Sequence, residues 1–205
     1  MKSLVLISGG IDSALTYKLA QLVSNKTDGL HISYGQNTAE AEFRSAKRLC
    51  EHNDAVLYHH TISGWQSECA LMNNISTTDS DKNYLPARNI IFLSLATAIA
   101  VEHKYTHIWI GGYGSGEGCE SSWDTKPAFT SQMQTTIQLG TNTDIEILQP
   151  LKTLTKDAVY QLVHTLDPTI LNFCVGCFVS DPPCNECEWC VINKRYLGWY
   201  DRKQQ

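Results

Sequence analysis

The chain has 205 residues, of which 42% are apolar and 18% are charged. These values are typical of one globular domain with a sizeable core, and they exclude an intrinsically disordered chain. The formal net charge of −5 at pH 7 disfavours non-specific nucleic-acid binding, which requires neutralisation of phosphates. The N-terminal apolar run is only about four residues long, so we expect no signal peptide, no membrane span and a cytoplasmic location.

Short apolar runs alternate with stretches of helical spacing along the chain. Strands are predicted at 4–7, 29–33, 55–58, 107–110 and 145–148, and helices from near residue 12 and over 39–50, 88–102 and 156–166. Residues 63–82 and 114–124 are predicted as loops, the second of them over a site. The alternation predicts an α/β fold, a Rossmann-like open parallel sheet with helices on both faces. In such sheets, ligands bind at the carboxyl ends of the strands.

The first predicted strand runs into the stretch Ser-Gly-Gly-Ile-Asp-Ser at residues 8–13. Two glycines permit a sharp turn and a close approach, and the helix N-terminus that follows offers N–H groups and a positive dipole end to an anion. The stretch therefore indicates a phosphate-binding loop. The residues predicted to hold a nucleotide are Ser8, Gly9, Gly10, Asp12 and Ser13. A simple turn capped by Asp12 or Ser13 is the alternative.

The loop lacks the Lys-Ser/Thr pair of a Walker motif. Any nucleotide would therefore be held by backbone amides and hydroxyls, and Asp12 would be free to hold Mg²⁺ on the phosphates. The residues of the loop indicate phosphate binding but leave the reaction open.

Five of the eight cysteines lie between residues 174 and 190. Their repeated two-residue spacing is typical of thiolates that converge on one tetrahedral ion. We predict a zinc site with four ligands, Cys177, Cys184, Cys187 and Cys190. Cys174 as the fourth ligand, and an iron–sulfur cluster in place of zinc, remain open. Four thiolates leave no position for substrate, so we expect a structural ion that fixes the C-terminal segment. The basic residues Lys194, Arg195, Arg202 and Lys203 beyond it are expected in a solvated tail.

Several stretches, in consistent order from about residue 3 to 195, resemble the 7-cyano-7-deazaguanine synthases of queuosine biosynthesis. The loop at residues 8–13 resembles the pyrophosphatase loop of the wider ATP pyrophosphatase superfamily. The other matching stretches are Tyr34-Gly35-Gln36, Pro86-Ala87-Arg88-Asn89, Pro150-Leu151 with Leu154-Thr155-Lys156, and the triple Cys184, Cys187 and Cys190. The resemblance implies an adenine nucleotide alpha hydrolase-like fold, a single domain over 1–205 with a zinc-binding segment at 174–195, and a homodimer.

The resemblance also implies an activity. ATP would adenylate the carboxylate of 7-carboxy-7-deazaguanine, ammonia would convert the adduct to an amide, and a second ATP would drive loss of oxygen to give the nitrile. Asp12 would position Mg²⁺, and Arg88 and Lys156 would stabilise phosphate charge. Tyr34 and Asp124 would bind the deazaguanine, with Trp123 as another residue able to stack on a base. The alternatives are a surface cation at a helix start for Arg88, a helix N-terminal lysine for Lys156, a loop cap for Asp124, and simple packing for the aromatic rings.

The sequence departs from the family in the predicted substrate loop. The family's Asp-x-Ser-Gly-Tyr-Pro-Asp-Cys-Arg-Pro-x-Phe corresponds to residues 118–129, where only Asp124, Pro127 and Phe129 clearly match. A relative that stops at the amide, or that joins the acyl group to another amine such as a protein, therefore stays open. So do a tRNA-modifying enzyme of the superfamily and a non-catalytic zinc-ribbon module, although retention of Asp12 and Ser13 argues against the latter.

Overall fold

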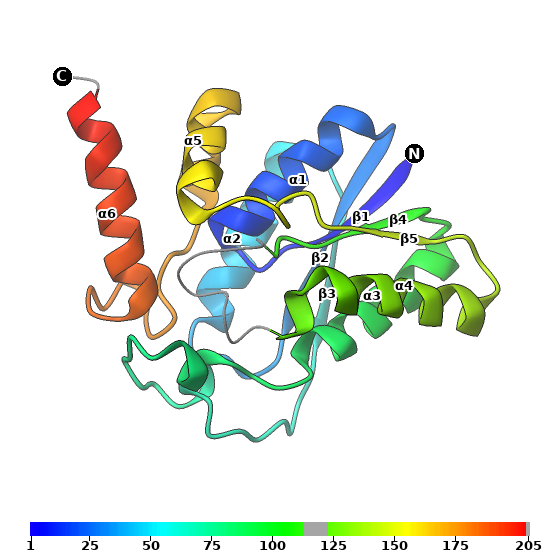
Figure 1. The fold of residues 1–205 in the computed structure, drawn as a ribbon, viewed down its shortest axis with the longest axis horizontal. Coiled ribbons are helices and arrows are strands. Elements are labelled where there is room, and N and C mark those ends of the chain that lie inside the picture. The colour runs from blue at the N-terminus through cyan, green and yellow to red at the C-terminus, as the bar shows by residue number, and fades with distance from the viewer. Residues whose placement is uncertain (113–122, 204–205) are drawn as a thin grey trace.

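The computed structural model describes residues 1–112 and 123–203, with the side chains of Ser80 and of residues 197–203 left out. Five parallel strands form one sheet in the order β3-β2-β1-β4-β5 (Figure 1). The strands are β1 Lys2–Leu6, β2 Lys26–Ser33, β3 Leu57–Thr61, β4 His107–Trp109 and β5 Glu146–Leu148. The helices are α1 Ile11–Val23, α2 Ala39–His52, α3 Arg88–His103, α4 Pro127–Thr141, α5 Lys156–Leu166 and α6 Glu188–Lys203.

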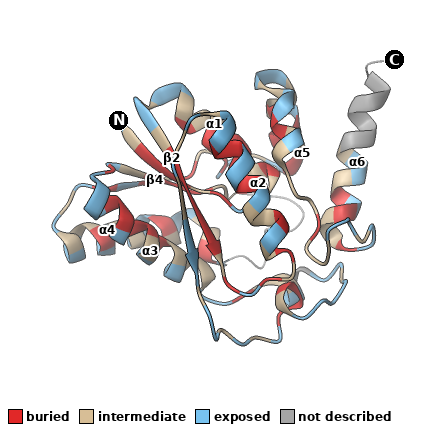
Figure 2. Cartoon of the chain, turned by 180° about the vertical axis from the view of Figure 1, so that it is seen from behind, coloured by how far each residue is buried: buried red, intermediate tan, exposed pale blue. Residues whose placement is uncertain are grey.

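Helices cover both faces of the sheet, as the alternating pattern predicts. On one face, Val5 and Ile7 pack with buried residues of α1, α2 and α5. On the other, Leu4 and Ile108 pack with buried residues of α3 and α4. The buried residues concentrate along the sheet and on the inner sides of these helices (Figure 2). The predicted Rossmann-like α/β class is confirmed.

The strand order reverses beside β1, the central strand. From β1 the chain continues outward through β2 to β3, then crosses to the other side of β1 to form β4 and β5. The helix α1, which follows β1, and the helix α4, which comes after β4, therefore lie on opposite faces of the sheet. Such a switch point opens a crevice where open α/β sheets bind ligands.

Two helices were not predicted. The large apolar residues on the inner side of α4, Phe129, Met133 and Ile137, recur about once per turn among Thr and Gln, and Leu139 is exposed, so the periodicity is weak. The helix α6 replaces the expected solvated tail. Its Ile192 is buried, and its Tyr196 stacks on Tyr160 of α5 with ring centroids 4.7 Å apart.

Smaller differences concern boundaries. β3 begins two residues later than predicted and continues to Thr61. The predicted loop at 63–82 contains only short 3₁₀ helices, at Ala70–Met72 and Ser80–Asn83. Two others are Trp123–Thr125 and Pro168–Phe173. The predicted loop at 114–124 lies mostly outside the described residues.

One stretch of the described residues, Asp81–His103, is long and apolar enough to cross a membrane by length and composition. It contains α3, whose Leu93, Ala96 and Ala100 are fully buried against the sheet. A helix packed in this way is typical of the core of a doubly wound α/β domain.

Candidate active site and metal centre

A cavity of about 690 Å³ lies at the carboxyl ends of β1, β2 and β4. It is therefore at the switch point of the sheet, where the fold predicts a ligand. The loop at residues 8–13 forms part of its wall, and the start of α3 and the first turns of α6 form others. The predicted phosphate loop, the Arg88 helix start and the cysteine segment thus meet around one space.

Two glycines allow the loop to lie close to its neighbours. Gly9 has φ +84°, and a Cβ there would lie 2.9 Å from the backbone of Glu42. Gly111, just after β4, approaches α1 so closely that a Cβ would lie 2.9 Å from the backbone nitrogen of Ser13. Only glycine fits these positions without a shift of backbone, so the loop lies directly against α2 and the N-terminus of α1 lies directly against the end of β4.

Ser13 holds the loop in its turn. Its hydroxyl donates to the carbonyl of Gly10 at 2.9 Å and accepts the backbone N–H of Ser8 at 3.2 Å. The hydroxyl of Ser8 in turn accepts the N–H of Gly10 at 3.4 Å. These bonds shape the loop around the N-terminus of α1, the position at which helices bind phosphate.

Asp12 lines the cavity and forms an ion pair with Lys156, which is not part of the lining. The Lys156 ammonium donates to both carboxylate oxygens of Asp12, at 2.8 and 2.7 Å. Lys156 is 3% exposed, and burial lowers the pKa of its ammonium while Asp12 opposes that shift. Asp12 was expected to be free for Mg²⁺. Both of its oxygens already hold Lys156, so these residues do not fit a magnesium ion on Asp12 in this arrangement.

Tyr34 and Arg88 lie together on the cavity wall. Arg88 donates to the Tyr34 hydroxyl at 3.3 Å, and both residues line the cavity. Beside them is Glu42, which the sequence analysis missed although it follows the Tyr-Gly-Gln stretch closely. Glu42 accepts from Thr38 at 2.6 Å and from Gln36 at 2.9 Å. Burial raises the pKa of Glu42, and these two hydrogen bonds and Arg88 oppose the rise.

Asp124 and Trp123 are placed differently from Tyr34. Asp124 is buried, and its carboxylate accepts the backbone N–H of Asn89 at 3.0 Å. It thus anchors the first turn of α3, and it is not part of the cavity lining described above. Trp123 is 69% exposed and lies outside the lining. Among the predicted substrate residues, only Tyr34 lies on the cavity wall.

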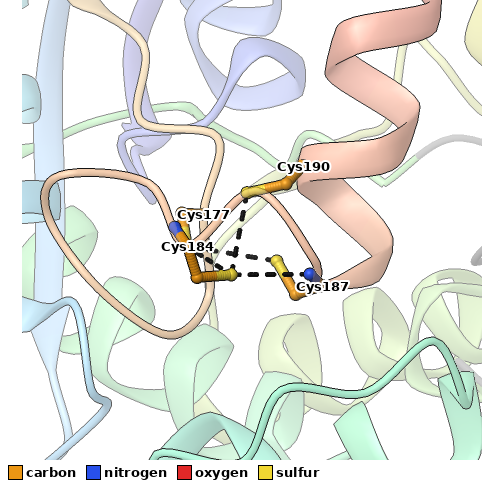
Figure 3. Close-up of side chains that lie close together, drawn as sticks. All are labelled: Cys177, Cys184, Cys187 and Cys190. Carbon is orange, nitrogen blue, oxygen red and sulfur yellow. Dashed lines mark hydrogen bonds between the residues drawn. The ribbon is translucent and has the colours of Figure 1, made fainter.

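Four cysteines converge beside this cavity. The thiols of Cys177, Cys184, Cys187 and Cys190 all lie within 4.8 Å of one another. Cys177 and Cys184 come from the loop before α6, Cys187 immediately precedes it, and Cys190 is in its first turn (Figure 3). Cys174 is not in the cluster, since its thiol donates to the Ile170 carbonyl at 3.2 Å. Burial raises the pKa of the Cys174 thiol to about 12.

The spacing of the sulfurs fits one tetrahedral ion. Three sulfur–sulfur distances are 3.6 Å for Cys177–Cys184, 4.0 Å for Cys177–Cys187 and 3.9 Å for Cys184–Cys190. Ligands about 2.3 Å from a tetrahedral centre are about 3.8 Å apart. A cluster of several irons holds its cysteines farther apart, so the geometry favours a single ion. Backbone N–H groups of Val179 and Ser180 also point to the Cys177 sulfur, at 3.3 and 3.4 Å.

A family model described as "Queuosine biosynthesis protein QueC" matches residues 2–200. The chain belongs to this family. Two curated relatives, from species of Sulfurovum and Nitratiruptor, are named 7-cyano-7-deazaguanine synthase, and each is 30% identical to this chain. The match to the Sulfurovum protein covers 95% of this chain and 92% of the relative, and the match to the Nitratiruptor protein covers 94% and 91%. The expected resemblance is confirmed.

A solved structure of NMN synthetase from Francisella tularensis is similar in fold to this QueC-family chain. Its TM-score is 0.51 at 20% identity, over 83% of this chain and 64% of that protein. At this identity the likeness supports the fold alone. The family match, by contrast, extends over the phosphate loop, the Arg88 helix start and the cysteine cluster together.

Proposed function

We propose that this QueC-family chain acts as a 7-cyano-7-deazaguanine synthase. It would activate the carboxylate of 7-carboxy-7-deazaguanine with ATP, transfer the acyl group to ammonia to give the amide, and use a second ATP to remove the amide oxygen and leave the nitrile. The observation that carries the proposal is the shared cavity. The helix start with its predicted phosphate loop and the Tyr34–Arg88 pair line one space of about 690 Å³ at the switch point of the sheet, and the buried Lys156 is bound to Asp12 of that loop. A space of this size suits a nucleotide or a substrate of similar size.

Two groups of residues divide the work. The N-terminus of α1, shaped by Ser8 and Ser13, would stabilise the pyrophosphate that leaves when the carboxylate attacks the α-phosphate. Lys156 would neutralise the Asp12 carboxylate beside the same loop, so that Asp12 does not repel the phosphates. The ring of Tyr34 and the guanidinium of Arg88 would offer a planar surface and a donor to the deazaguanine or its carboxylate.

We assign the cysteine cluster to one zinc ion with a structural role. Four thiolates complete its coordination and leave no open position, so the ion contributes folding energy rather than a reactive group. On this proposal residues 1–205 form one domain, and the segment 174–195 is part of the wall of the active site. We also propose a homodimer by analogy with the family, which light scattering tests directly.

The deciding experiment incubates the protein with ATP, ammonia and 7-carboxy-7-deazaguanine and follows pyrophosphate release and product mass. Release that requires the acid, with the nitrile as product, supports the synthase. Accumulation of the amide, or of a deazaguanine adduct on a protein, supports a variant of the same chemistry. No release with any deazapurine acid contradicts the proposal, and release that requires tRNA favours a tRNA-modifying enzyme.

A further inference from the structure

Trp189 connects the metal centre to the predicted catalytic lysine. It lies in the first turn of α6, between the ligand Cys187 and the ligand Cys190. Its side chain packs against the cysteine cluster on one side and against the main core on the other. Phe178, from the loop before the cluster, meets the indole edge-on with ring centroids 5.3 Å apart. The position of the indole is therefore set by the fold of the cysteine segment.

The face of the indole is turned to Lys156. The Lys156 Nζ is 4.2 Å from the centroid of the Trp189 ring, and only 2.7 to 2.8 Å from the Asp12 oxygens. The distance is well inside the range of a cation–π contact, and tryptophan is the best aromatic partner for a cation. Lys156 is 3% exposed, so protein groups must replace the water that its charge has lost. The indole and Asp12 hold the ammonium from two sides.

We propose that Trp189 is a positioning residue that holds the Lys156 ammonium on the phosphate loop, so that metal binding at the cysteine cluster orders the active site. The inference rests on the proposed adenylation activity for its catalytic meaning. It extends the role of the metal from fixing the end of the chain to setting the position of a charged group bound to Asp12 on the cavity wall.

Other contacts keep the segment attached when the indole is removed. The backbone N–H of Val175 donates to the Gly9 carbonyl at 2.8 Å. Asn193 of α6 accepts from the Tyr160 hydroxyl and donates to the Gly176 carbonyl at 2.9 Å. A Trp189→Ala variant is therefore expected to fold and to keep its metal, which allows the position of Lys156 to be tested by itself.

The direct test measures how fast acetic anhydride acetylates Lys156, by mass spectrometry, in the metal-loaded protein without ATP. In Trp189→Ala the rate should rise about tenfold, the range expected for loss of a desolvated cation–π contact. Trp189→Phe, which keeps a ring face, should stay close to the unmutated protein, whereas Trp189→Leu should resemble Trp189→Ala. Val179→Ala is the matched control, because Val179 packs against the cysteines but does not line the cavity.

A chelator tests the role of the metal in the same assay. Removing the metal from the unmutated protein should raise acetylation of Lys156, and removing it from Trp189→Ala should add little. In kinetics, Trp189→Ala should lower kcat about tenfold and change KM for ATP less than about twofold, because the lysine acts on charge in the transition state.

If Lys156 is acetylated at the same rate in metal-bound Trp189→Ala as in the unmutated protein, the proposal is wrong. It is also wrong if Lys156 is acetylated as slowly in Trp189→Leu as in Trp189→Phe. Unchanged acetylation after chelation overturns the link to the metal. If Trp189→Ala loses metal, the proposal is tested by comparing the acetylation rates of Lys156 in Trp189→Leu and Trp189→Phe. Acetylation of Lys156 does not depend on turnover. Absence of pyrophosphate release from the unmutated protein would therefore contradict the proposed function, and the acetylation test would still apply to the role of Trp189.

Discussion

The ammonium of Lys156 lies between both carboxylate oxygens of Asp12, although 144 residues separate the two in the sequence. The pair joins the first turn of α1 to the first residue of α5. Each charge is compensated by the other, so the carboxylate does not repel a phosphate at the adjacent loop. This single ion pair therefore leaves no uncompensated charge of Asp12 or Lys156 beside the phosphate loop.

Removing either member of this pair should lower the free energy of unfolding, and the loss should differ between the two variants. Asp12→Asn leaves a lysine that is 3% exposed without its carboxylate, and we expect a loss of about 3 kcal/mol in the free energy of unfolding. Lys156→Met leaves Asp12, which is 21% exposed, and should cost less because water can reach it. Urea unfolding of both single variants and the double variant measures the coupling, and additive losses would contradict the pair.

The four clustered cysteines should bind one zinc ion per chain. Cys187→Ser and Cys177→Ser are expected to lose metal and stability together, because the binding energy of a structural zinc is folding energy. Cys174→Ser is the matched control and should retain full metal, because the Cys174 thiol lies outside the cluster and donates a hydrogen bond to the Ile170 carbonyl. Metal analysis with thermal unfolding checks this. Full metal in Cys177→Ser, with loss in Cys174→Ser, would show that the fourth ligand is misassigned.

Gly111 should not tolerate a side chain. In Gly111→Ala the new Cβ would lie 2.9 Å from the Ser13 nitrogen, so α1 would have to move away from β4. We expect a loss of about 2 kcal/mol and strongly reduced pyrophosphate release. Gly140→Ala in α4 is the control, since nothing lies within 4 Å of its Cβ, and it should stabilise the protein by about 0.5–1 kcal/mol. Equal stability of the two variants would refute the close approach.

His31 should make the fold sensitive to acid. Burial lowers the pKa of His31 to about 4, opposed by its hydrogen bond to the Ile7 carbonyl at 2.8 Å, and His59 lowers it further. Between this value and about 6.5 the unfolded chain binds a proton that the folded chain does not, so stability falls as pH falls through that window. The contribution is about 3 kcal/mol.

The measurement compares urea unfolding at pH 7 and pH 4.5 in the unmutated protein and in His31→Gln. The unmutated protein should lose more stability than His31→Gln over this range. Equal losses in the two proteins would assign the acid sensitivity to other groups, such as His107, whose pKa is also lowered by burial.

The local patterns in the sequence were sufficient for the features that depend on neighbouring residues. The glycine pair at residues 9 and 10 and the helix that begins at Ile11 follow from backbone conformation over a few residues. The two-residue spacings of Cys184, Cys187 and Cys190 bring their thiols to one centre within a single turn and the start of a helix. The alternation of apolar strands and helices was enough for the fold class.

Contacts between distant segments depended on the tertiary structure. The sequence analysis gave Asp12 a role in positioning Mg²⁺ and Lys156 a separate role in stabilising phosphate charge, and only the packing of α5 beside α1 shows that the two side chains bind each other. The sequence likewise carried no sign that Trp189 faces Lys156, because periodicity reports which residues share a face of one helix, not what that face meets. The fold class followed from local periodicity, whereas the pairing of charges at the site was set by the crossovers that bring three remote segments to one end of the sheet.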